Sequence, residues 1–155
     1  MVVVDGADVV VRDRVELSDP TGRVPKNAYQ RVRGLDLDAA AELVEAAARV
    51  AGEQAVAALT QANAPVCAVV VGSDTRDPPL GSILASHALA HAAEGRLYQR
   101  ALLEAAESLG LEAVAVPRAT IWEERQRLDK LGPPWGEDQK LAALAAWTAI
   151  GRRSG

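Results

Sequence analysis

Val66-Cys67-Ala68-Val69-Val70-Val71 is the stretch that decides the fold. It is short, rich in β-branched residues and apolar throughout, as expected of a central strand covered on both faces. A loop over residues 72–79 follows, and apolar spacings of three and four then predict a long helix from about Ser82 to Leu109. Gly110 comes directly after this helix, where a left-handed cap is common. A strand followed by a long helix is typical of an α/β protein.

The same alternation continues on both sides of this unit. Upstream, the pattern predicts a helix from Asp36 or Asp38 to near Asn63. Downstream, residues 112–116 predict a second strand. The last expected elements are two helices, over residues 118–131 and 137–150.

The first 35 residues predict a β-hairpin and a long connection. Two Val-rich stretches, residues 2–4 and 8–17, are separated by Asp5-Gly6, a dipeptide favoured in tight turns. Residues 18–35 are rich in turn formers and predict a long functional loop. We therefore expect a single α/β domain over residues 1–155, with a mixed, partly parallel sheet, an N-terminal β-hairpin and flanking long helices.

The composition limits the classes of function. Hydrophobic residues make up 49% of the chain and aromatic residues only 3%, so the core must be built from Ala, Val and Leu. The net charge of −4 gives no basic surface of the kind that attracts nucleic acids or anionic membranes. Cys67, the only cysteine, is expected to be a core residue. The sequence has no signal-like or membrane-spanning stretch, so we expect a cytoplasmic protein.

The only two histidines of the chain, His87 and His91, lie one helical turn apart on the predicted second long helix. With Glu94 they fall within an arc of roughly 60°, because each residue turns a helix by about 100°. The opposite face of this helix is charged and carries Arg96, Arg100 and Glu107. We therefore expect the trio to face the core or a cleft, near the carboxyl end of the central strand, where open α/β sheets bind ligands.

Three interpretations of this trio remain open. A histidine pair at i and i+4 can ligate a metal ion such as zinc or magnesium, and so can His91 with Glu94. A single ion bound by all three is harder, because His87 and Glu94 lie about 10 Å apart along the helix axis. Alternatively, Glu94 orients His91 or His87, and that histidine acts as the base in a hydrolytic reaction. The third interpretation is a structural polar cluster satisfied by backbone groups or buried water.

Three further side chains are candidates for the same site. Ser73 and Asp74 lie in the loop after the central strand, and Tyr29 lies in the long polar segment, from which its hydroxyl could close over a cleft. A small-molecule ligand is the partner that such a cleft predicts. The rival prediction is a non-catalytic homo-oligomer whose Ala-rich helices pair through exposed apolar residues such as Leu103.

Three carboxylates suggest a separate site. Asp5, Asp74 and Asp138 lie at strand ends or helix starts, where capping is the usual role of such residues. The order of elements, with the segment Gly132-Pro-Pro-Trp-Gly-Glu-Asp-Gln-Lys140 before an apolar helix, resembles the ribonuclease H-like superfamily, and most nearly its Holliday-junction resolvase branch. The resemblance implies that the three carboxylates bind divalent metal ions in a nuclease acting on branched or damaged DNA.

A second resemblance concerns the predicted histidine-bearing helix. The stretch Ser86-His-Ala-Leu-Ala-His-Ala-Ala-Glu-Gly-Arg-Leu-Tyr98, together with the Gly-Pro-Pro-Trp-Gly segment, resembles an uncharacterised family of bacterial proteins. This resemblance implies that the helix and the final turn belong to one architectural unit. It implies no function.

Overall fold

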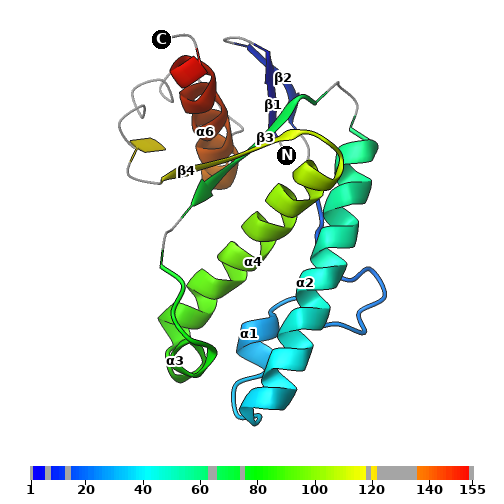
Figure 1. Ribbon diagram of the computed structural model, residues 1–155, viewed down its shortest axis with the longest axis vertical. Helices are drawn as coiled ribbons and strands as arrows, with labels where there is room; N and C mark the ends of the chain where they lie inside the picture. The colour runs from blue at the N-terminus through cyan, green and yellow to red at the C-terminus, as the bar shows by residue number, and fades with distance from the viewer. Residues whose placement is uncertain are drawn as a thin grey trace.

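The computed structural model describes residues 2–5, 8–12, 15–62, 66–73, 76–117, 120–121 and 136–153. Its strands are β1 (Val2–Asp5), β2 (Asp8–Arg12), β3 (Ala68–Ser73) and β4 (Glu112–Pro117). Its helices are α1 (Ala28–Arg31), α2 (Leu37–Thr60), α3 (Leu80–Ala85), α4 (His87–Ser108) and α6 (Glu137–Arg153). Figure 1 shows this mixed α/β arrangement, which confirms the predicted fold class at that level.

The strands form two pairs. β1 and β2 form the predicted antiparallel hairpin, and β3 and β4 run parallel from Ala68 opposite Glu112 to Ser73 opposite Pro117. Within the described residues these pairs are two separate two-stranded sheets, so the prediction of one mixed sheet is wrong there. The strand predicted over residues 8–17 is also too long. β2 ends at Arg12, and the Glu16 carboxylate instead accepts hydrogen bonds from the backbone and side chain of Ser18.

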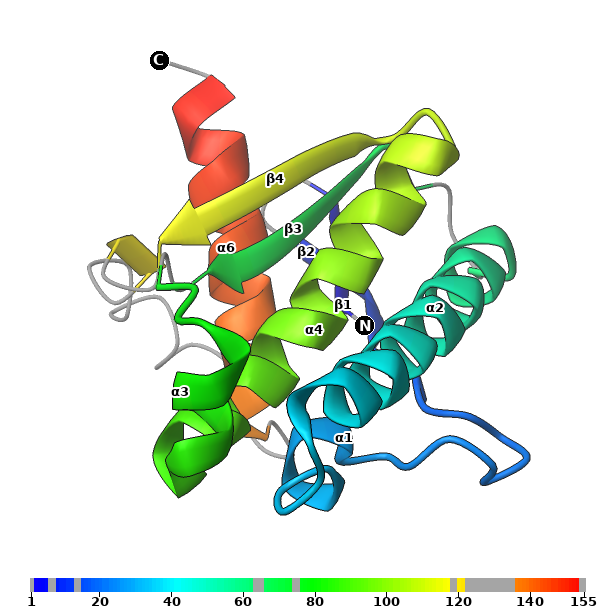
Figure 2. The ribbon, with the colours of Figure 1, turned by 60° about the horizontal axis from the view of Figure 1, so that its bottom comes forward.

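The parallel pair is covered on both faces, as the apolar run of β3 predicts (Figure 2). Val69 and Val71 pack with Ala106 of α4, whereas Val70, between them, packs with the core of α6. Successive side chains of a strand point to opposite faces, which explains why Val69, Val70 and Val71 are all apolar. The core on the α6 side consists of Val116, Ile121, Ala143, Leu144, Ala145 and Trp147.

Small side chains let the two long helices pack closely. Ala47 and Ala51 of α2 meet Leu97 and Ala101 of α4, and all four side chains are buried. The α2 helix begins where the sequence predicts, because the Asp36 carboxylate accepts the Ala39 N–H at 2.9 Å and caps the first turn. The Ala-rich composition therefore supports close helix packing.

The predicted helix 82–109 is two helices in the structure. Ser86 is extended, with φ −126° and ψ 123°, and it separates α3 from α4. Its hydroxyl accepts the Leu89 N–H at 3.3 Å, so it caps the start of α4. Gly110 has φ +70° and ends α4 in the left-handed conformation that glycine favours, as predicted. The cap at Ser86 makes His87 the first residue of α4.

Three other predictions change with the structure. Cys67 is exposed rather than buried, because it precedes the first paired residue of β3. Leu103 is not an exposed contact but packs against the Val69 and Val71 core. The predicted loop 18–35 contains the short helix α1. Most of the predicted helix 118–131 lies outside the described residues. Among the helices that are described, none has the length and apolar character of a membrane span.

Candidate metal-binding site

The two histidines lie side by side at the start of α4. Their Nε2 atoms are 3.2 Å apart, and the imidazole rings meet edge to face, with centroids 4.4 Å apart and planes at 76°. Both side chains are exposed. The pair exists because residues four apart on a helix lie one above the other, and because the Ser86 cap starts the helix at His87.

Gln30 of α1 selects the tautomer of a neutral His87 ring. The Gln30 Oε1 atom lies 3.2 Å from Nδ1 of His87, and a carbonyl oxygen can only accept a hydrogen bond. The proton of the neutral His87 ring therefore sits on Nδ1, and Nε2 presents a lone pair to His91. The Gln30 amide nitrogen also donates to the His87 carbonyl at 3.5 Å. Gln30 thus forms hydrogen bonds with both the ring and the backbone carbonyl of His87, the first residue of α4.

A second cross-link holds the segment after α1 against the same end of α4. Nε of Arg33 donates to the Leu84 carbonyl oxygen of α3 at 3.2 Å. Leu84 lies three residues before His87, so Gln30 and Arg33 fasten this segment on both sides of the Ser86 break. These side-chain hydrogen bonds on both sides of Ser86 therefore fix the position of the histidine pair relative to α1.

Glu94 has a different environment from the histidines. It is 8% exposed, and its Oε1 accepts the backbone N–H of Tyr29 at 2.8 Å. Asn27, at the start of α1, makes no side-chain cap bond, so Glu94 takes over that role from α4. Its Oε2 is buried without a hydrogen-bond partner among the described residues. Burial raises the pKa of Glu94, and the bonds from α1 backbone N–H groups oppose this effect.

The predicted inward orientation of the trio is right for Glu94 and wrong for His87 and His91. The shared stripe of α4 faces α1 and the segment before it, as the bonds of Gln30, Tyr29 and Lys26 show. The α1 helix has only four residues, so it spans about 6 Å. It covers Glu94 and reaches His87 through Gln30, but it leaves both imidazoles exposed.

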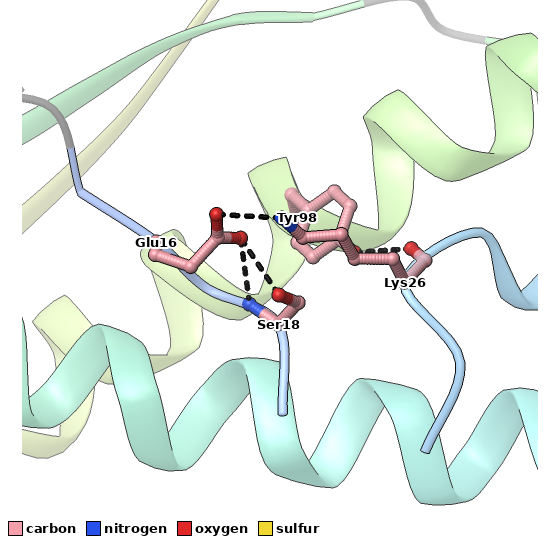
Figure 3. A network of polar contacts seen from close by, with 4 residues as sticks. All are labelled: Glu16, Ser18, Lys26 and Tyr98. Carbon is pink, nitrogen blue, oxygen red and sulfur yellow. Dashed lines mark hydrogen bonds and ion pairs between the residues drawn. The ribbon is translucent and has the colours of Figure 1, made fainter. Parts of the chain in front are cut away.

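The segment before α1 is tied to the same stripe (Figure 3). The Tyr98 hydroxyl donates to the Lys26 carbonyl oxygen at 2.6 Å, and the Lys26 ammonium lies 2.8 Å from the Glu16 carboxylate. The Lys26 hydrogen bond, with that of Ser18, lowers the pKa of Glu16 to about 2. These bonds fix the approach of the chain to α1, and through it the place of Gln30.

Of the other predicted site residues, the structure describes the side chains of Tyr29 and Asp5. Tyr29 is half-buried against Ile83, Ala90 and Ala93, so it packs between helices and does not form a lid. Asp5 is exposed and lies opposite Asp8 in the hairpin. Asp74 and the side chains of Ser73 and Asp138 lie outside the described residues.

Gln30 is the residue of the candidate site that sequence reasoning misses. It lies in a segment read as a loop, and no periodicity or spacing relates it to a histidine 57 positions away.

The pair has the separation that two ligands of one metal ion require. Zinc–nitrogen bonds of 2.0–2.1 Å at a tetrahedral angle place the two nitrogens about 3.3–3.4 Å apart. The observed 3.2 Å also fits a hydrogen bond from Nε2–H of His91 to Nε2 of His87 in the metal-free chain. A metal ion would take the place of this bridging proton, which moves to Nδ1 of His91.

Two ligands are all that the described residues offer. No group of three or more His, Cys, Asp or Glu side chains that could hold a metal occurs among them. Comparisons of the chain with protein-family models, curated proteins and solved structures found no match.

Proposed function

We propose that this protein binds a divalent metal ion, with zinc as the preferred ion, through Nε2 of His87 and His91. The main observation that supports this proposal is the 3.2 Å separation of these two atoms on one helix. Imidazole is a ligand that zinc favours, whereas magnesium prefers oxygen ligands, so this pair favours zinc over magnesium.

The bond from Gln30 supports the proposal. Histidines that ligate metals usually donate their other ring N–H to an oxygen atom, which fixes the tautomer and the ring orientation. Gln30 Oε1 is the oxygen atom that faces the other ring nitrogen, Nδ1, of His87. We expect Gln30→Leu to weaken zinc binding about tenfold, within the usual range for such partners.

A hydrolytic reaction would need a general base beside a metal-bound water. Glu94, expected to orient a histidine base, is instead buried and bonded to the Tyr29 N–H. The function supported by the described residues is therefore metal binding.

The nuclease implied by the ribonuclease H-like resemblance stays a prediction. It requires Asp5, Asp74 and Asp138 to share metal ions, and only Asp5 has a described side chain. That side chain is exposed at the end of the hairpin.

Zinc titration of the untagged full chain, in competition with a chromophoric chelator, tests the proposal. We expect His91→Ala to weaken binding at least about tenfold, because one of two protein ligands is lost. Glu104→Ala is the matched control, since it removes an exposed carboxylate from the same helix. Equal zinc affinity in the wild-type chain and a folded His91→Ala variant would contradict the proposal.

A further inference from the structure

The surface around the histidine pair is unusual for a solvated helix. Residues 81–95, all described, include eight exposed positions. Two of these are the histidines, and the others are Gly81, Ser82, Ala85, Ala88, Ala92 and Gly95. Protein surfaces normally carry charged residues at about a quarter to a third of their positions. Here the one charged residue, Glu94, is buried.

The rest of α4 has an ordinary surface. Its exposed positions beyond Gly95 include the charged residues Arg100, Glu104 and Glu107. The uncharged patch is therefore confined to the end of the helix that carries the histidines. Ala88, Ala92 and Gly95 follow one another at spacings of four and three, so they line one side of the helix next to the pair.

The site itself is incomplete. Structural zinc is almost always bound by four ligands, and His87 and His91 supply two. Glu94 is buried with its Oε1 bonded to the Tyr29 N–H, and no group of three possible metal ligands occurs among the described residues. The missing ligands must come from outside the described portion of this chain, with water as the simplest source.

We infer that a second copy of this chain completes the site, so that one zinc ion joins two copies through His87 and His91 of each. The inference rests on the proposed function. A two-fold axis through the ion brings the same surface of both copies together, as most homodimers do. It also supplies four imidazoles, a full tetrahedral set.

The uncharged patch is suited to this contact. Packed helices lie 8–10 Å apart, depending on the side chains between them, and the exposed alanine and glycine positions allow the close end of that range. Residues 81–95 expose no charge of their own, which limits like-charge repulsion between two copies to neighbouring groups such as Arg33, bonded at the Leu84 carbonyl.

Sedimentation velocity of the full chain, with zinc added from zero to one equivalent per chain, tests this inference. We expect a monomer in a chelator and a species of twice the mass with zinc. Formation of that species should be complete at half an equivalent of zinc. His91→Ala should remain a monomer throughout.

The outcomes separate the inference from the proposed function. Zinc bound one to one by a monomer would overturn the shared site and leave zinc binding standing. No zinc binding would remove both.

Ala92→Gln gives a second check that does not touch a ligand. Ala92 is exposed, so the variant should fold normally, but the longer side chain should hold the two helices apart. We expect zinc binding by the monomer to persist while dimer formation weakens at least about tenfold, or about 1.4 kcal/mol. Unchanged dimer formation by Ala92→Gln would place the second copy elsewhere.

Discussion

The two halves of α4 share one helix but have different surroundings. The carboxyl-terminal half lies on the parallel strands, with Ala106 fully buried against Val69 and Val71, and its outer side is charged. The amino-terminal half lies away from the strands and contacts α1 and α3, and its exposed side carries His87, His91 and small residues. The carboxyl-terminal half therefore packs on the sheet, whereas the amino-terminal half buries Ala90 and Ala93 against Ile83 and exposes the two histidines on its other side.

The largest effect should come from placing the same charge on each half. Ala106→Glu buries an unpaired carboxylate against the sheet and should lower the free energy of unfolding by at least about 3 kcal/mol. Ala92→Glu, at an exposed position, should change it by less than about 0.5 kcal/mol. Urea denaturation of both variants, each in a chelator, measures the difference. Similar losses would contradict the assigned burial of Ala106 and exposure of Ala92.

Glu94 should contribute next, because it joins the amino-terminal half to α1. Glu94→Ala leaves the Tyr29 N–H without its acceptor and should cost about 2–3 kcal/mol. Glu94→Gln keeps an oxygen that can accept this bond, so it should cost less. Thermal and urea unfolding at neutral pH check the order. A Gln variant as unstable as the Ala variant would contradict the capping role.

The same carboxyl group should give a distinct pH dependence. Burial raises the pKa of Glu94, so the folded chain holds this proton more tightly than the unfolded chain. As pH rises from the ordinary value of 4.5 through the raised value, the unfolded chain loses its proton first and this group's contribution to stability falls. The stability of the wild type relative to Glu94→Gln should therefore decrease across that window. An increase in this stability difference with rising pH would contradict a raised pKa for Glu94.

Tyr98 should have a smaller effect, since only one bond is removed. Tyr98→Phe deletes the hydroxyl that donates to the Lys26 carbonyl oxygen and should cost about 1 kcal/mol. Hydrogen exchange should rise in residues 15–27 and stay unchanged in β3 and β4. A uniform increase in exchange over the whole chain would show that the Tyr98 bond does not stabilise this segment locally.

Glu16 should give the smallest effect, because its ion pair with Lys26 is exposed. Its contribution to stability is present above pH 4.5 and is lost as pH falls through about 2. A titration of the side-chain carboxyl by NMR should give a pKa near 2 in the wild type and a higher value in Lys26→Met. High salt should reduce the difference between them. An ordinary pKa for Glu16 in both proteins would rule out the ion pair.

The sequence predicts the regular elements well where one periodicity dominates. The apolar run of β3, the Asp36 cap and Gly110 each act over a few residues, so their effects can be read locally. The joining of the strands into sheets cannot be read in this way, because it depends on pairing between distant segments. The break at Ser86 is also missed, since apolar spacing continues through it.

The candidate site is predicted only in part for the same reason. Helical spacing brings His87, His91 and Glu94 onto one stripe, and this much follows from the sequence. What covers the stripe is decided by α1, a four-residue helix within a segment of turn-forming composition. That short helix buries Glu94, leaves the imidazoles exposed and provides Gln30. No local sequence pattern predicts any of these three features.

Long-range proton–nitrogen NMR spectra of the two imidazoles test the central claim, that His87 and His91 form one ligand pair, most directly. In the metal-free chain we expect the proton of neutral His87 on Nδ1 and that of His91 on Nε2, as the bonds to Gln30 and between the rings require. On zinc addition, both Nε2 signals should shift together to the metal-bound range, and both protons should be on Nδ1. Two imidazoles with averaged tautomers, neither of which responds to zinc, would contradict the account.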